Sequence, residues 1–163
     1  MTGSDFAGEF NSENEKDECR QGLRQVVVFE IGDQPFAVNV ESVREIIRWQ
    51  GVREIPQTPR SLMGVSTIRG EVLPVIDLAA FFEIQDSIPA EQKILIVLEM
   101  GENGLRTGVA VDSVKRIFSI TTEQMDSTLK GAFIGENLHC VVKHGEINVL
   151  MPDFERIINA FKL

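Results

Sequence analysis

The sequence lacks the residue patterns on which most catalytic and metal centres depend. It has no glycine-rich loop ending in Gly-Lys-Ser or Gly-Lys-Thr for a phosphate, and no His-Glu-x-x-His segment. With two cysteines and two histidines in all, it offers no zinc-ligand spacing. These absences predict no metal and no cofactor, and they favour a binding protein over an enzyme.

The sequence also lacks a surplus of positive charge and any long apolar run. Its 16 Lys and Arg against 25 Asp and Glu give a net charge of −9. Nucleic acid is therefore excluded as a main partner, because such binding depends on cations that neutralise phosphates. No apolar run approaches the ~20 residues that span a bilayer, and a secretory signal is absent. We expect a cytoplasmic protein without direct membrane insertion, whose partners are proteins or a small molecule.

The two cysteines lie in different surroundings. Cys19 is in a polar stretch and Cys140 in an apolar one, which favours free thiols in a reducing cytosol over a disulfide. Cys140 follows His139, so a small enzyme with a Cys/His pair is an alternative. Adjacent side chains of one strand point to opposite faces, whereas a nucleophile and its base need hydrogen-bond reach. A buried thiol beside a surface imidazole is the simpler interpretation.

What the chain does contain is an internal repeat. Residues 26–33 read VVVFEIGD and residues 95–102 read LIVLEMGE; residues 38–46 read VNVESVREI and residues 109–117 read VAVDSVKRI. Later, GEV at 70–72 matches GEI at 145–147. A chain built twice from one β-rich plan predicts two similar halves, and the seam between them is a place to bind partners.

The periodicity of the apolar residues predicts a mainly β fold. The expected strands are 25–31, 36–40, 44–49, 65–68 and 71–76 in the first half, and 93–100, 105–111, 114–119, about 133–142 and 146–150 in the second. Helices are expected at 77–82, with Asp77 as N-cap, and at 153–162, where Phe154, Ile157, Ile158 and Phe161 form one apolar face.

Five short strands a half predict a small, partly closed barrel for each, with the following helix plugging its open end. The acidic segment 1–22 is predicted to be disordered, and 85–92 to be a polar linker. The expected organisation is one domain over 23–163, with barrel 1 over about 23–84 and barrel 2 over about 93–152.

A few single residues have two interpretations each. Arg69, at a tight turn before Gly70, is either solvated or an anchoring guanidinium for a partner, since arginine is enriched at interface hot spots. Glu45 either lies on a solvated strand face, where Arg44 or Arg48 can pair with it, or meets a partner. Trp49, the single tryptophan, is expected to pack in a barrel rather than contact a partner.

Residues 64–78 read GVSTIRGEVLPVIDL, and this stretch resembles the CheW family of bacterial chemotaxis coupling proteins. Residues 43–47 (VREII), 55–59 (IPQTP) and 108–114 (GVAVDSV) resemble further segments of that family in the same order. The similarity covers roughly residues 25–161. One departure is Thr67, where the family commonly has Asn.

The resemblance implies two five-stranded barrels of the SH3 kind, packed through a shared apolar interface. It implies an adaptor that couples the cytoplasmic tip of chemoreceptors to the histidine kinase CheA through the regulatory domain of the kinase. By motif position, Glu45, Ile46, Gly64 and Arg69 match positions implicated in coupling. With them, Val43, Ile46 and Ile68 are expected as an apolar floor in the seam, with Arg69 and Glu45 at its rim.

Two further alternatives stay open at this point. The chain can be a coupler of the same kind in another motility pathway, which the sequence alone does not separate from chemotaxis. It can also be a sensor that binds a small molecule in the seam between the halves.

Overall fold

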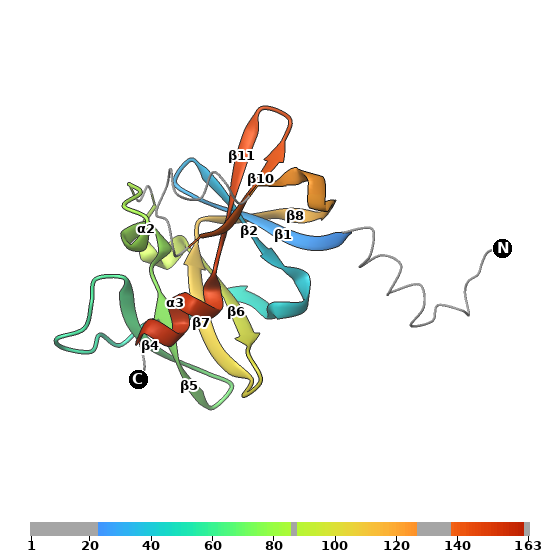
Figure 1. Cartoon of the computed structure of the whole chain (residues 1–163). Helices are drawn as coiled ribbons and strands as arrows, with labels where there is room; N and C mark the ends of the chain where they lie inside the picture. Colours follow the sequence, from blue (N-terminus) through green and yellow to red (C-terminus); the bar gives the residue numbers. More distant parts are fainter. Residues whose placement is uncertain (1–22, 86–87, 127–137, 162–163) are drawn as a thin grey trace.

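The structure, a computed structural model, describes residues 23–85, 88–126 and 138–161, which form two sheets and a few short helices (Figure 1). The predicted disorder of 1–22 and the start of the strand expected near 133 lie outside these residues. In sheet order, the six-stranded sheet contains β8 (Ser113–Ile120), β1 (Arg24–Ile31), β2 (Gln34–Asn39), β11 (Ile147–Pro152), β10 (Leu138–His144) and β9 (Met125–Asp126). The five-stranded sheet contains β3 (Val43–Arg48), β6 (Ile94–Met100), β7 (Leu105–Val111), β5 (Glu71–Ile76) and β4 (Leu62–Ile68).

Each sheet combines strands from both halves of the sequence. The β1–β2 hairpin joins strands of the second half, with Phe36 of β2 parallel to Leu150 of β11. The β6–β7 hairpin joins strands of the first half, with Val75 and Ile76 of β5 parallel to Gly108 and Val109 of β7. The expected division into barrels over 23–84 and 93–152 is therefore wrong: the halves exchange their first hairpins.

This exchange is possible because β1 and β6 are buried on both faces. In β1, Val27 and Phe29 enter a core shared by the two sheets, whereas Val26 and Val28 enter a second core inside the six-stranded sheet. The same alternation divides β6, with Ile96 and Leu98 in the shared core and Leu95 and Val97 inside the five-stranded sheet. Side chains of a strand alternate between its faces, so these two apolar strands each serve two cores and join the sheets.

Both α-helices of the described residues contribute side chains to the shared core. The first, α2 (Leu78–Phe81), begins at Asp77, whose Oδ1 accepts a hydrogen bond from the Ala80 amide at 3.3 Å, so the predicted N-cap is confirmed. The second, α3 (Phe154–Phe161), places Phe154, Ile157 and Ile158 in the shared core. Short 3-10 turns complete the described elements: η1 (Val40–Ser42), η2 (Ala90–Gln92) and η3 (Thr122–Gln124).

An ion pair that the sequence did not predict lies between the end of the linker and the turn after β7. Lys93 Nζ is 2.7 Å from Asp112 Oδ1, and both side chains are almost buried. The second carboxylate oxygen of Asp112 accepts from the Gly32 amide at 2.8 Å. These contacts tie the β1–β2 turn to the five-stranded sheet.

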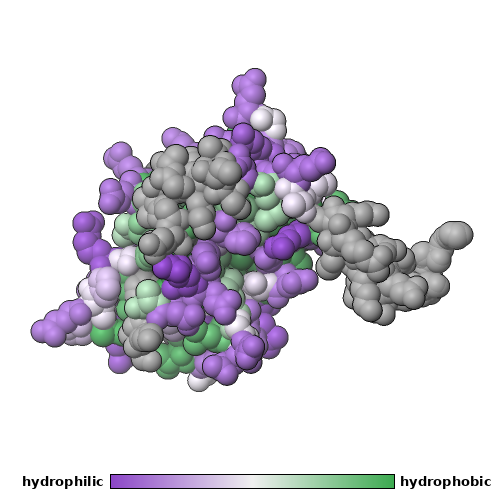
Figure 2. Space-filling model, in the orientation of Figure 1, coloured by the Kyte–Doolittle hydropathy of each residue, from purple (hydrophilic) through white to green (hydrophobic). Residues whose placement is uncertain are grey.

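On the outside, hydrophilic residues cover most of the face in Figure 2.

Candidate partner-binding surface

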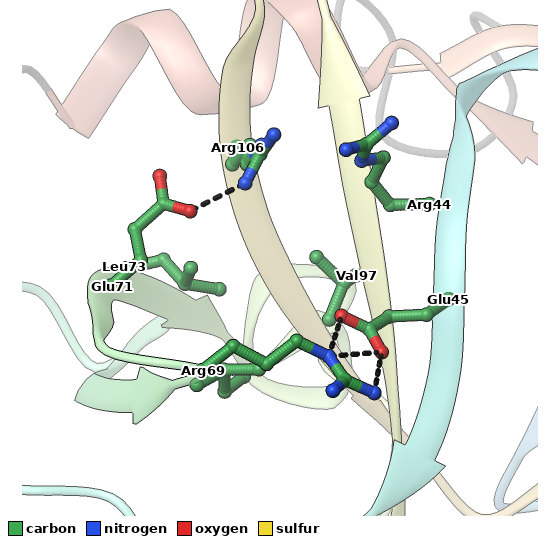
Figure 3. A pocket seen from close by; sticks show the side chains of 8 residues that line it. Arg44, Glu45, Arg69, Glu71, Leu73, Val97 and Arg106 are labelled. Atoms are coloured by element: carbon green, nitrogen blue, oxygen red, sulfur yellow. Dashed lines mark hydrogen bonds and ion pairs between the residues drawn. The ribbon is translucent and has the colours of Figure 1, made fainter.

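A cavity of about 300 Å³ opens on the five-stranded sheet (Figure 3). We call it the charged pocket; its lining residues are Arg44, Glu45, Ile68, Arg69, Glu71, Leu73, Val97 and Arg106. All of them come from β3 to β7 or the β4–β5 turn. The pocket therefore belongs to one sheet and does not lie in the seam between the two sheets, which is filled by the shared core.

Arg69 and Glu45 form the main contact across this pocket. Arg69 Nε lies 3.1 Å from both carboxylate oxygens of Glu45, and Nη2 lies 3.0 Å from Oε1. The hydrogen bond from Arg69 lowers the pKa of Glu45 below its ordinary value, so the carboxylate stays charged. The sequence singled out both residues but did not predict that they pair.

The backbone conformation at Arg69 is one that disfavours arginine, so the geometry of the turn does not explain this residue. Arg69 has φ of 52° and Gly70 has φ of 82°. Turns with two such residues favour Asn-Gly or Gly-Gly, and the left-handed conformation costs a residue with a Cβ about 1–2 kcal/mol. The Arg69 side chain is nonetheless 75% exposed. It offers its guanidinium to the surface at some cost to the turn, as expected for a recognition residue.

The rest of the rim alternates in charge. Arg106 Nη1 lies 2.5 Å from Glu71 and Arg106 Nε lies 3.3 Å from Glu99, which also pairs with Arg44 at 3.1 Å. Exposed pairs of this kind add about 0–1 kcal/mol to stability. Charged groups around an apolar floor instead contribute specificity and orientation toward a partner. The arrangement is therefore suited to recognition.

The predicted floor residues fall in three different places. Ile68 is buried and lines the charged pocket, together with Leu73 and Val97, which the sequence analysis did not single out. Val43 packs against the shared core. Ile46 points outward and is 43% exposed. Because residues alternate along β3, Ile46 cannot share the face of Glu45.

Gly64 lies away from the charged pocket and serves the backbone of the five-stranded sheet. A Cβ at this position would lie 2.2 Å from the carbonyl oxygen of Arg53. Arg53 and Val65 exchange two backbone hydrogen bonds there, at 2.8 and 2.9 Å. Glycine inside a strand often marks such a close approach, and this was the signal available in the sequence. Trp49 packs against the core of the same sheet, as predicted.

A second cavity, of about 270 Å³, opens on the six-stranded sheet and was not predicted. Its walls are mainly apolar, including Val26, Val28, Ala37, Phe118 and Val149. We call it the apolar pocket. Lys115, Arg116 and His144 also line it.

The strand pairings show that the two pockets occupy equivalent places. Glu45 faces Val97 in one sheet as Arg116 faces Val28 in the other, and a register shift follows each pair at the same point. The pair Ile68 and Glu71 flanks the β4–β5 turn as His144 and Ile147 flank the β10–β11 turn.

In the structure, the equivalence between the β4–β5 and β10–β11 hairpins is offset by one residue from the sequence match of residues 70–72 with 145–147. The turn residues are Arg69 and Gly70 in one hairpin and Gly145 and Glu146 in the other. Gly145 thus stands where Arg69 stands, and the second half has no counterpart of that arginine.

The possible Cys140–His139 pair has no catalytic geometry. Cys140 is fully buried, with Sγ 3.8 Å from Met151 Sδ, whereas His139 is exposed on the other face of β10. Burial raises the pKa of the Cys140 thiol to about 11, away from the range of a reactive thiolate. Within residues 23–85, 88–126 and 138–161, no three His, Cys, Asp or Glu side chains gather as metal ligands. No helix in these ranges is long and apolar enough to cross a membrane.

Comparisons with known proteins agree on one family. A family model described as "CheW-like domain" matches residues 25–162. The probable chemotaxis protein CheW of Rhizobium etli is 39% identical over 108 residues, which cover 66% of this chain and 68% of the relative. The chemotaxis protein CheW of Klebsiella aerogenes is 28% identical over 139 residues, covering 84% and 82%.

Among solved structures, the scaffolding protein TtCheW from Thermoanaerobacter tengcongensis shares the fold. The TM-score is 0.71 at 21% sequence identity, and the match covers 80% of this chain and 88% of that protein.

Proposed function

The chain belongs to the CheW-like domain family and is a chemotaxis coupling adaptor, and we propose that it joins the histidine kinase CheA to the cytoplasmic tip of chemoreceptors. The support is the family match over residues 25–162 and relatives that carry the name chemotaxis protein CheW. In this role the protein works by binding, without a catalytic site or a cofactor, and it resides in the cytoplasm with its partners.

The charged pocket is the surface that we assign to the receptor. Ile68, Leu73 and Val97 provide an apolar floor for the side chains of an amphipathic receptor helix. Glu45 and Arg69 stand beside it as a charged pair that can exchange hydrogen bonds with the helix. The observation that carries this assignment is the exposed Arg69 guanidinium, held in a left-handed turn that a smaller residue would suit better.

The kinase then binds a separate surface, on the six-stranded sheet. The shared core makes the two sheets one body, because β1 and β6 each contribute side chains to it. A receptor state that binds the charged pocket more tightly would thereby favour the kinase state that fits the same adaptor. Differential affinity for two states is the general requirement for such coupling.

The test is a calorimetric titration of the full chain with a receptor-tip fragment and with the regulatory domain of CheA. Arg69→Glu should weaken receptor binding about tenfold or more, equivalent to about 1.4 kcal/mol, and leave kinase binding unchanged. Arg116→Glu is the matched control for the receptor titration alone, where it should leave binding unchanged, because it reverses an exposed charge at the equivalent place of the other sheet.

Unchanged receptor binding by Arg69→Glu would remove the charged pocket as the receptor surface. No binding of the kinase domain at tens of micromolar would count against coupling to CheA and would favour an adaptor of another motility pathway.

A further inference from the structure

We propose that the apolar pocket binds the chain's own N-terminal segment, residues 1–22. The ring of Phe6 or Phe10 fills the pocket, and acidic side chains of the segment lie beside Lys115 and Arg116 at its rim. The proposal concerns the isolated protein, so it holds whether or not the kinase and receptor assignments do.

The apolar pocket has the size and lining for an aromatic ring. Its volume is about 270 Å³, whereas a dry cavity of about 150 Å³ with Leu, Ile and Phe walls suffices for benzene. Ile147 on its lining and Ile117 on the neighbouring edge strand β8 are 55% and 58% exposed. Apolar surface left open beside an apolar pocket indicates a site that is covered by another group.

The charge at this pocket differs from that at its equivalent. In the charged pocket Glu45 supplies a carboxylate to Arg69. Arg116 stands in the place of Glu45 in the apolar pocket; its guanidinium lies 4.6 Å from the centre of the Phe118 ring and makes no ion pair with a described residue. Lys115 pairs only loosely with Glu30, at 3.7 Å. A carboxylate brought by a ligand would complete this rim.

The N-terminal segment carries both groups that the pocket lacks. Its only aromatic residues are Phe6 and Phe10. Six acidic residues against Lys16 and Arg20 give a charge of 2 − 6 = −4 over residues 1–22. The acidic residues are Asp5, Glu9, Glu13, Glu15, Asp17 and Glu18.

The segment is also tethered beside the pocket. Arg24, the first residue of β1, pairs with Ile120, which lines the pocket, and Val26 lines it as well. Phe10 precedes Arg24 by 14 residues, and a chain of that length reaches at most about 50 Å. A short tether gives an effective concentration in the millimolar range, so a contact with a Kd of about 1 mM would keep roughly half of the molecules docked.

A spin label in the full chain tests this contact. Cys19→Ser with Ser12→Cys moves the single reactive thiol close to Phe10, while the buried Cys140 stays unlabelled. In NMR spectra of the labelled protein, the amide signals of Phe118, His144 and Ile147 should lose about half of their intensity or more. They should recover when ascorbate reduces the label. Signals around Arg69 and Leu73, at the equivalent pocket, should change little.

Two further variants connect the broadening to the proposed contacts. Phe6→Ser with Phe10→Ser, in the same labelled chain, should restore the Phe118 and Ile147 signals. Arg116→Glu should reduce the broadening without unfolding the protein, because this side chain is exposed.

Three outcomes would overturn the proposal. The first is no broadening at the apolar pocket, and the second is equal broadening at both pockets. The third is broadening in a mixture of two kinds of chain: isotope-enriched chains without a spin label, and spin-labelled chains without isotope enrichment. Broadening in that mixture would show that the segment binds a second copy of the protein.

Discussion

The two pockets are built on the same plan and present opposite chemistry. Glu45 and Arg116 occupy equivalent positions on equivalent strands, yet one is an acid paired with Arg69 and the other is a base stacked on Phe118. Arg106 in one pocket corresponds to Pro35 in the other, since they face Glu99 and Glu30 respectively. The shared apolar pattern thus fixes the fold of both sheets, and a few positions at the pocket rims decide what each surface can bind.

The largest effect is expected from Gly64, a position where the two sheets differ in backbone packing. Gly64 faces Val75 as Cys140 faces Met151, but a Cβ at Gly64 would lie 2.2 Å from the backbone oxygen of Arg53. Gly64→Ala should therefore lower the free energy of unfolding by about 3 kcal/mol or more, through overpacking and strain at φ of 145°. Urea denaturation measures the change.

Gly70→Ala is the matched control for that substitution. It also places a Cβ at positive φ, but in open space, so we expect a loss of only about 1 kcal/mol. Equal losses for the two variants would show that Gly64 acts through its backbone conformation alone. A stable Gly64→Ala variant with impaired partner binding would instead support the binding role that the family resemblance implies for Gly64.

A charge swap sharpens the contrast between the charged pocket and its equivalent. Glu45→Arg combined with Arg69→Glu preserves an ion pair across the pocket but reverses its direction. If the pair only orders the hairpin, the double variant should bind the receptor fragment as the unmodified chain does. If the partner reads the charges, as we propose, binding should stay weakened about tenfold. Titration of both single variants completes the cycle.

Much of this fold was predictable from the sequence. The bounds of β5 and β7 agree with the apolar pattern, and the Asp77 cap agrees with the residue type. Pattern identifies the buried faces of a strand but not its neighbour, and consecutive strands are the usual expectation. The exchange of hairpins could therefore not be predicted, because β1 and β6 are buried on both faces and fit either sheet.

The candidate site was predictable residue by residue but not as an arrangement. The resemblance selected Glu45 and Arg69, which are 24 positions apart, without indicating their contact. Local spacing allowed a pair of Glu45 with Arg44 or Arg48, yet Arg44 reaches Glu99 on the neighbouring strand. Such cross-strand contacts depend on the register between neighbouring strands. That register cannot be read from the sequence when the strands are so far apart along the chain.

The next expected effect separates the buried thiol from a catalytic one. Burial raises the pKa of Cys140 to about 11, so near neutral pH its thiolate is scarcer than that of an exposed cysteine. A thiol reagent should modify Cys140 at least about tenfold more slowly than Cys19. Mass spectrometry of the labelled chain resolves the two sites, and fast labelling of Cys140 at pH 7 would revive the enzyme alternative.

The same shift predicts how this group affects stability in base. The folded pKa lies above the ordinary value of 9.0, so the thiol's contribution to stability is fully present below pH 9. It is lost as the pH rises toward 11, because only the unfolded chain ionises readily there. Cys140→Ala should flatten the fall of stability in that window, and an unchanged slope would assign the fall to other groups.

The smallest effect concerns a polar side chain inside one barrel where the other is apolar. Ser66 faces Leu73 in the five-stranded sheet as Val142 faces Val149 in the six-stranded sheet. Ser66 is 4% exposed, and its hydroxyl finds no hydrogen-bond partner among the described residues. A buried hydroxyl without a partner costs about 1–3 kcal/mol, so Ser66→Ala should leave the free energy of unfolding unchanged or raise it by up to about 1 kcal/mol. Ser66→Val copies the other barrel and tests whether there is also room for two methyl groups. A loss of stability in Ser66→Ala would show that the hydroxyl is satisfied, by water for example, and that the five-stranded barrel is wetter than its counterpart.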